Sequence, residues 1–245
     1  PDNRVIGVRS YGDTPGQVTE YGLGMMRGLL SRKVIPCVKH FPGHGDTRED
    51  SHLSLPVVDK TKEELWQMEL APFEQAVKAG VPAIMTSHVV YPALEPGGIP
   101  ATMSRAVITG LLREELGYQG MVVSDSMEMA AIHKYYGTPE GVLSAFQAGV
   151  DIVLISHSME QAKEAVLMAE EAVSRGDLRR EAVEEAVDRI LSWKAGLAGP
   201  EAGTKVEAAD RRLEAELLKQ TYTVVHLPKE GLPQLGEKPF FTGCY

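Results

Sequence analysis

Cysteine is scarce in this sequence. Cys37 and Cys244 are the only two among 245 residues, so no disulfide framework is expected. No apolar run is long enough to cross a bilayer, and no Gly-x-Gly-x-x-Gly or Walker sequence follows an apolar stretch, which argues against a nucleotide site. Basic residues are fewer than acidic ones, with 25 Lys and Arg against 34 Asp and Glu, which gives a formal net charge of -9. This balance argues against non-specific binding to nucleic acid or to an anionic membrane surface.

What is present is an ordinary globular composition, with 43% hydrophobic and 24% charged residues. A chain of this length can bury a sizeable core and form one or two domains. The first residue, Pro1, is not methionine, and we expect further residues to precede it. A secretory signal is therefore neither visible nor excluded, and the compartment, cytoplasmic or facing the cell wall, is open.

Short apolar stretches alternate with amphipathic helical patterns about four times. Helices are expected at 15–32, 61–80, 104–116, 139–148, from 158 onward, and 178–195. Strands are expected at 34–38, 83–88, 121–123 and 151–157. The second helix opens with a capping box, Thr61-Lys-Glu-Glu64, and Pro72 is expected to kink it. This alternation predicts a parallel sheet covered by helices, which either an open doubly wound sheet or a (β/α) barrel satisfies.

One regularity favours the barrel. His40, His88, Asp125 and His157 each follow a different predicted strand, and the carboxyl ends of barrel strands share the rim on which active sites lie. We therefore predict an α/β fold in which residues 1–197 form part of a (β/α)8 TIM-type barrel.

The composition changes after the last predicted helix of the barrel region. Gly196, Gly199, Pro200 and Gly203 are typical of a linker. A charged amphipathic helix is expected at 206–220 and a strand at 221–225. We predict that residues 198–245 are a linker and the start of a second α/β domain.

The loop that follows the predicted strand 34–38 holds three histidines, three acidic residues and a lysine between Lys39 and His52. Three interpretations are open: a plain surface loop, a metal site, or an acid/base pair. The metal site would use the following residues: His40, His44, Asp46, Asp50 and His52. The acid/base pair would be Asp50 and His52, which point the same way on an extended segment, so that the carboxylate orients the imidazole and favours its charged form.

Asp125 is the second candidate catalytic carboxylate, and it also has two interpretations. As the residue after a buried strand it suits the N-cap of a helix. At a barrel rim it suits the nucleophile of a retaining glycosidase, with His52 as the acid/base that protonates the leaving oxygen. Such a mechanism requires neither a metal nor an organic cofactor.

These motifs resemble those of a known family. Lys39-His-Phe-Pro-Gly-His-Gly-Asp46 and Val123-Ser-Asp-Ser-Met127 resemble glycoside hydrolase family 3, and Asp50-Ser-His52 resembles its β-N-acetylhexosaminidase branch. Residues 1–10 and Met85-Thr-Ser-His88 fit the same branch. The resemblance covers the predicted barrel region, and it implies that the family's first barrel strands, with an acidic residue and an arginine that contact the sugar, precede Pro1.

The resemblance implies a retaining exo-β-N-acetylglucosaminidase that acts on a small carbohydrate with a terminal β-linked GlcNAc, such as a cell-wall muropeptide or a chitooligosaccharide. It makes Asp125 the nucleophile and His52 the acid/base, oriented by Asp50. The substrate contacts that it implies are Arg9, Lys39, His40, His88 and Met129.

Three other functions are open: a β-N-acetylglucosaminide phosphorylase, since a histidine acid/base does not repel phosphate; a β-glucosidase of the same family; and a non-catalytic carbohydrate-binding protein. Because an open part-barrel exposes strand edges, we also expect the chain to be unstable alone unless another segment completes it.

Overall fold

The computed structural model describes residues 3, 6–47, 55–196, 211–213 and 215–216. Asp50 and His52 lie outside the described residues, as do Gly199, Pro200 and Gly203 of the predicted linker, the strand at 221–225 and most of the helix predicted at 206–220. The chain divides into two compact units, residues 1–200 and 201–245. In the second unit, the described residues are helical. The rest of the fold described below belongs to the first unit.

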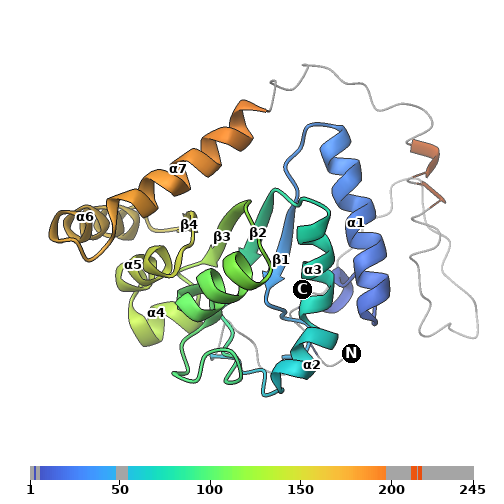
Figure 1. The fold of residues 1–245 in the computed structure, drawn as a ribbon, viewed down its shortest axis with the longest axis horizontal. Helices are drawn as coiled ribbons and strands as arrows, with labels where there is room; N and C mark the ends of the chain where they lie inside the picture. The colour runs from blue at the N-terminus through green and yellow to red at the C-terminus, as the bar shows by residue number, and fades with distance from the viewer. Residues whose placement is uncertain (1–2, 4–5, 48–54, 197–210, 214, 217–245) are drawn as a thin grey trace, which may run out of the picture. The chain divides into compact units, whose positions relative to one another are not determined.

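Four parallel strands form one sheet in the order β1-β2-β3-β4 (Figure 1). They are β1 (Cys37–Phe41), β2 (Ala83–Thr86), β3 (Met121–Ser126) and β4 (Ile152–Leu154). Each strand pairs with the next strand of the sequence, and helices lie between them in the chain, as the alternation predicts. The predicted α/β class with a parallel sheet is therefore confirmed. Closure into a barrel and instability of the chain alone stay predictions.

The first strand begins later than the prediction of 34–38. Pro36 has no N–H to donate to a neighbouring strand, and pairing starts at the next residue, where Cys37 faces Ala83. The strand then continues to Phe41, whose side chain is fully buried. Lys39 and His40 therefore lie within β1 rather than in the loop after it.

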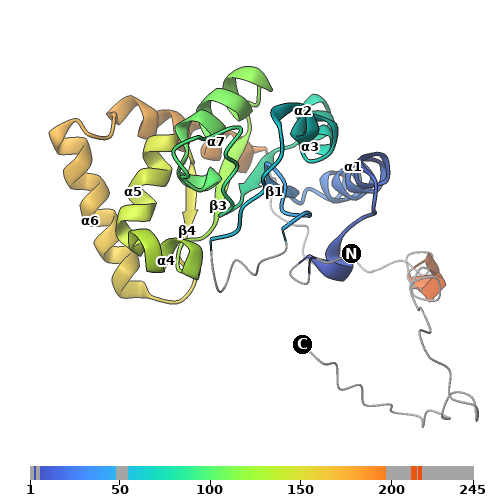
Figure 2. The same cartoon turned by 90° about the horizontal axis from the view of Figure 1, so that it is seen from below.

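The described part of the first unit has seven α-helices: α1 (Pro15–Ser31), α2 (Lys62–Gln67), α3 (Leu70–Lys78), α4 (Ala130–Tyr136), α5 (Thr138–Ala148), α6 (Met159–Arg175) and α7 (Arg180–Ala195). Two 3-10 helices, Gly7–Arg9 and Ala101–Met103, and a π-helix, Ala106–Glu115, complete the set. In Figures 1 and 2, α1 and α3 lie at the β1 side of the sheet, and α5 and α6 lie at the β4 side. None of the helices in the described ranges is both long and apolar enough for a bilayer.

The predicted kinked helix 61–80 is two helices. The capping box is present, because Thr61 Oγ1 accepts from Glu64 N–H while the Glu64 carboxylate accepts from Thr61 N–H. The chain turns at Met68, which ends α2. Pro72 lies in the first turn of α3, where its missing N–H breaks no helical hydrogen bond. The break therefore precedes the proline, and no kink at Pro72 is needed.

The sheet and its helices share one hydrophobic core. Fully buried side chains from the strands, such as Ile84 and Val122, pack with Leu65 of α2. Phe41 of β1 and Phe73 of α3 meet edge to face with ring centroids 5.2 Å apart. This core holds the strands at fixed spacing, so that the residues at their carboxyl ends have defined relative positions.

A buried ion cluster fastens the opposite end of the sheet. The Asp151 carboxylate, just before β4, accepts from Arg113 Nη2 at 2.6 Å and from Arg189 Nη2 at 2.9 Å. It also accepts from the backbone N–H of Val122 at 2.7 Å. Asp151 thereby links the π-helix, α7 and β3 at the amino-terminal ends of β3 and β4, away from the carboxyl ends of the strands.

Candidate active site

Asp125 is the next-to-last residue of β3 rather than the residue after the strand. Its side chain is 25% exposed, and its Oδ1 accepts a hydrogen bond from Ser126 N–H at 2.8 Å. The following helix, α4, begins only at Ala130, with Met129 as its N-cap. The interpretation of Asp125 as a helix N-cap is therefore wrong, and a partly exposed carboxylate remains at the carboxyl end of the sheet.

His40 of β1 lies beside this carboxylate, with Nε2 3.7 Å from Asp125 Oδ2. Its side chain is only 9% exposed. Burial lowers the pKa of His40 from 6.5 to about 4, because the opposing effect of Asp125 is outweighed and the nearby Lys39, His44 and Arg9 lower it further. His40 is therefore neutral at neutral pH.

Both residues lie where the pairing of the sheet is irregular. The register shifts between Lys39 and Phe41 on β1, and between Val123 and Ser126 on β3. An extra residue at such a point turns side chains away from their regular alternation. These irregularities explain how His40 and Asp125 come together although two strands carry them and β2 lies between those strands.

The predicted cations Arg9 and Lys39 gather at the same place. Both side chains are exposed, and both are close enough to His40 for their charges to lower its pKa. Arg9 is the last residue of the 3-10 helix Gly7–Arg9. The structure thus places two exposed cations and a carboxylate near one buried imidazole. Contacts of these residues with a substrate stay predictions.

The loop after β1 is held in place by the protein. Asn3 Nδ2 donates to the carbonyl oxygens of His44 at 2.5 Å and Gly45 at 3.2 Å. The Tyr91 hydroxyl donates to the carbonyl of Gly43. His44 stacks edge to face on His40, with ring centroids 5.8 Å apart. The first part of the loop is therefore a fixed wall of the site rather than a plain surface loop.

The proposed metal ligands in this loop have other partners where they are described. Asp46 pairs with Lys60 at 2.8 Å, and His44 Nδ1 lies 2.8 Å from Thr47 Oγ1. Within the described part of the chain, no three His, Cys, Asp or Glu side chains converge on one point. Asp50 and His52 are outside that part, so the metal interpretation and the acid/base pair both stay predictions.

His88 lies just beyond the carboxyl end of β2, as the sequence predicts. It is 2% exposed, its Nε2–H donates to the carbonyl of Ser126 at 2.9 Å, and its Nδ1 lies 2.9 Å from Thr102 Oγ1. Burial also lowers its pKa. Both ring nitrogens therefore lie within hydrogen-bond distance of protein atoms, and His88 supports the end of β3 through Ser126. A substrate contact by His88 stays a prediction.

Two further predicted residues lie at the rim. Met129 is half-buried and its N–H donates to the carbonyl of Ser126 at 3.1 Å, closing the turn that follows Asp125. His157, after β4, has a side chain that is 85% exposed, and its Nδ1 lies 3.2 Å from the carboxylate of Glu128. A substrate contact by Met129 stays a prediction.

Sequence reasoning missed Glu128 and Ser126. The Glu128 carboxylate accepts the backbone N–H groups of Ser156, His157 and Ser158. The only sequence signal was their place in Asp125-Ser-Met-Glu128, directly after the candidate nucleophile. That pattern does not show which backbone the carboxylate reaches, since its partners are about thirty residues away.

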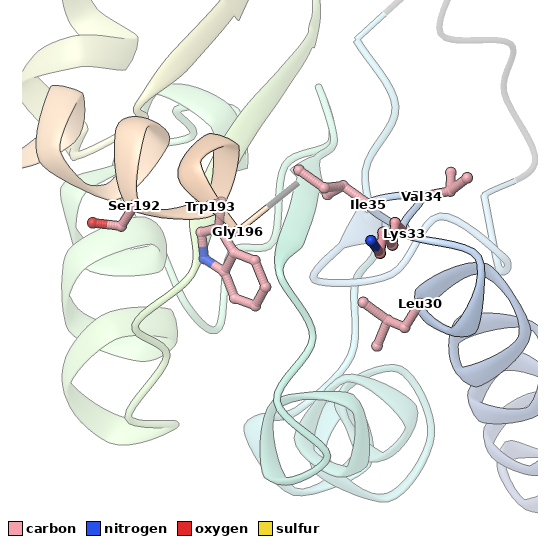
Figure 3. Close-up of a pocket in the computed structure, with 7 residues that line it drawn as sticks. All are labelled: Leu30, Lys33, Val34, Ile35, Ser192, Trp193 and Gly196. Carbon is pink, nitrogen blue, oxygen red and sulfur yellow. The ribbon is translucent and has the colours of Figure 1, made fainter. Parts of the chain in front are cut away.

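A separate cavity of about 380 Å³ lies away from this cluster (Figure 3). Its lining combines the segment before β1 with the ends of α1 and α7: Leu30, Lys33, Val34, Ile35, Ser192, Trp193 and Gly196. It contains none of the predicted site residues, and it lies at the amino-terminal side of β1. Parallel sheets bind substrates at the opposite, carboxyl side, so this cavity is not the candidate active site.

Comparisons with known proteins agree with the geometry. Residues 1–193 match the Glycosyl hydrolase family 3 N terminal domain. The chain is 36% identical over 250 aligned positions to Beta-hexosaminidase A of Pseudoalteromonas piscicida, covering 92% of this chain and 42% of that protein. It is 39% identical over 155 positions to the Beta-hexosaminidase of Stenotrophomonas maltophilia (strain K279a), covering 63% of this chain and 46% of that one.

A solved structure shows the same fold. The glycoside hydrolase family 3 beta-N-acetylglucosaminidase from Paenibacillus sp. str. FPU-7 is 47% identical, with a TM-score of 0.80 over 86% of this chain and 40% of that one. The chain thus spans less than half the length of these relatives, and its α/β sheet matches the family's N-terminal domain over part of the length of that domain. The chain belongs to the glycosyl hydrolase family 3 N-terminal domain family.

Proposed function

We propose that this chain carries the nucleophile of a retaining exo-β-N-acetylglucosaminidase, and that the nucleophile is Asp125. The observation that carries the proposal is a partly exposed carboxylate at the carboxyl end of β3, beside a buried neutral histidine and two exposed cations. The names of the relatives support the choice of sugar, and the match of residues 1–193 to the Glycosyl hydrolase family 3 N terminal domain supports completion of this sheet as part of a (β/α)8 barrel.

In the proposed reaction, Asp125 attacks the anomeric carbon as the bond to the leaving oxygen breaks. A covalent glycosyl-enzyme forms, and an acid protonates the departing oxygen. We assign that acid to His52, oriented by Asp50, on the sequence argument alone. In the second step the same imidazole removes a proton from water, which attacks the anomeric carbon and releases Asp125.

The neutral state of His40 has a function in this scheme. A charged imidazole 3.7 Å from Asp125 would pair with the carboxylate and compete with the anomeric centre for its charge. The neutral ring leaves that charge available, and its position beside Asp125 suits a contact with the sugar. We assign further contacts to Arg9, Lys39 and Met129, and we propose muropeptides or chitooligosaccharides as natural substrates.

The test uses the protein expressed from its complete reading frame and an aryl β-N-acetylglucosaminide. We expect release of the aryl group by the wild type, and a loss on the order of 10³-fold or more in Asp125→Asn and His52→Ala. Asp188→Asn, at an exposed site on α7, is the matched control and keeps full activity. An Asp125→Asn variant with most of the wild-type rate would contradict the assignment.

The same assay separates the alternative reactions. Stimulation by inorganic phosphate, with a sugar 1-phosphate as product, identifies a phosphorylase. Faster release from an aryl β-glucoside than from the N-acetylglucosaminide identifies a β-glucosidase. Binding of N-acetylglucosamine without cleavage of any of these substrates identifies a non-catalytic protein.

A further inference from the structure

Glu128 makes an unusual set of hydrogen bonds near the candidate nucleophile. Its Oε2 accepts from Ser156 N–H and His157 N–H, each at 2.6 Å, and its Oε1 accepts from Ser158 N–H at 2.7 Å. His157 Nδ1 lies 3.2 Å from Oε2. Three consecutive amides of the loop between β4 and α6 therefore converge on one carboxylate that follows the end of β3.

The charge state of Glu128 suits this arrangement. Desolvation raises the pKa of a carboxyl group, but the hydrogen bonds from Ser158, His157 and Ser156 outweigh it and lower the pKa of Glu128. The group is thus ionised at neutral pH. Hydrogen bonds from N–H groups to an ionised carboxylate are stronger than those between neutral partners.

A second bond links this loop to the strand that bears Asp125. Ser156 Oγ donates to Ser126 Oγ at 2.9 Å. Ser126 is thus held through three of its groups. Its hydroxyl accepts from Ser156 Oγ, its N–H donates to Asp125 Oδ1, and its carbonyl accepts from His88 Nε2–H. A shift of Ser156 is therefore expected to reach the Asp125 carboxylate through a single intervening residue.

We propose that Glu128 is a positioning residue that fixes the Asp125 carboxylate by clamping the loop between β4 and α6. The clamp is the set of three backbone bonds to residues 156–158, and the connection to Asp125 is the bond between Ser156 and Ser126. The proposal rests on the proposed function, because it takes Asp125 as the group that attacks the sugar.

The geometry requires two acceptor oxygens. An amide in place of the carboxylate has one oxygen, so its NH₂ group must face either Ser158 N–H or the pair from Ser156 and His157. Glu128→Gln is therefore expected to break the clamp although it preserves the size of the side chain. Glu160→Gln, at an exposed residue in the first turn of α6, makes the same charge change without touching the clamp.

The experiment measures kcat and KM for an aryl β-N-acetylglucosaminide with the protein from its complete reading frame. We expect Glu128→Gln and Glu128→Ala to lower kcat by roughly 10- to 100-fold, because a small misplacement of a reacting group costs this much. KM changes less than about 3-fold, and Glu160→Gln matches the wild type. Ser156→Ala lowers kcat as well, and combining it with Glu128→Ala adds little, since both changes break the same path.

Chemical rescue distinguishes a clamp from a general structural role. Removal of the side chain in Glu128→Ala leaves three amides directed at a site that acetate or formate fits. We expect either anion to restore part of kcat in Glu128→Ala without changing the anomeric configuration of the product. Rescue of Asp125→Ala by such anions would instead come from their attack on the sugar, which inverts that configuration.

Hydrogen exchange of the segment 155–158 tests the clamp without any catalysis. We expect faster amide exchange there in both Glu128 variants and unchanged exchange in Glu160→Gln. Wild-type kcat in Glu128→Gln, or unaltered exchange at 155–158, would overturn the positioning role while the proposed function stands. An inactive wild type together with faster exchange in the variants would overturn the proposed function, and the catalytic role of Glu128 with it, but not the clamp.

Discussion

The protonation of His40 offers a quantitative test of the site's electrostatics. His40 is nearly buried beside Asp125, and burial, with the nearby Lys39 and Arg9, lowers its pKa to about 4. In the unfolded chain its pKa is near 6.5. Replacing it by glutamine, in His40→Gln, keeps a polar side chain of similar reach but removes the titrating group.

Proton binding at His40 sets the direction in which the free energy of unfolding changes with pH. Between about pH 6.5 and pH 4 the unfolded chain binds a proton at His40 that the folded protein excludes, so the free energy of unfolding falls as the pH is lowered through this range. Above pH 6.5 both states are neutral and His40 has no effect. The difference between the unfolded pKa of 6.5 and the folded pKa of about 4 corresponds to a total loss of roughly 3 kcal/mol in the free energy of unfolding. About 2 kcal/mol of that loss is reached at pH 5.

Denaturant unfolding at pH 7 and pH 5 measures this effect. Between pH 7 and pH 5, we expect the free energy of unfolding to fall by about 2 kcal/mol more in the wild type than in His40→Gln. The control His133→Gln, at an exposed histidine of α4, is expected to lose as much as the wild type. In NMR spectra the His40 ring is expected to keep its neutral shifts down to about pH 5. Equal losses in wild type and His40→Gln, or an NMR midpoint near 6.5, would refute a buried neutral His40.

Two further substitutions test the fold around the site. Asp151→Ala leaves Arg113 and Arg189 without their shared buried carboxylate, and we expect a loss of about 3 to 5 kcal/mol in the free energy of unfolding; a loss below about 1 kcal/mol by denaturant titration would contradict this. Gly43→Ala places a Cβ 2.6 Å from the Cβ of Glu69, and we expect it to lower the thermal midpoint by overpacking worth about 1 to 3 kcal/mol. An unchanged thermal midpoint would contradict this, because it would mean that the loop around Gly43 shifts to accommodate the added methyl group.

Local sequence rules predicted the elements whose signals are local. The capping box at Thr61 and the helix start at Ser158 both formed, because a cap needs only residues three positions apart. The strand predicted at 34–38 was wrong at both ends, since β1 is Cys37–Phe41. The apolar character of residues 34–38 does not show that pairing with the next strand starts only after Pro36. Pro72 was placed in a helix interior because the break at Met68 has no Gly or Pro to mark it.

For the candidate site, the sequence indicated which residues to consider but not their geometry. The position of His40 and Asp125 after apolar strands indicated one edge of the sheet, and the structure brings them to 3.7 Å. The irregular pairing that turns both side chains together depends on neighbouring strands. The same holds for His88 and Glu128, whose partners lie far away in the sequence, so no local pattern predicted that both support the end of β3.

The central claim, that Asp125 forms a covalent bond to the sugar, is tested most directly by trapping that bond. A fluorinated N-acetylglucosaminide with a good leaving group, which forms the glycosyl-enzyme faster than water removes it, is incubated with the protein. Peptide mass spectrometry then locates the label. We expect one sugar per protein on Asp125 and none in Asp125→Asn. A label on any other residue, or turnover of the reagent with inversion and no label, would contradict it.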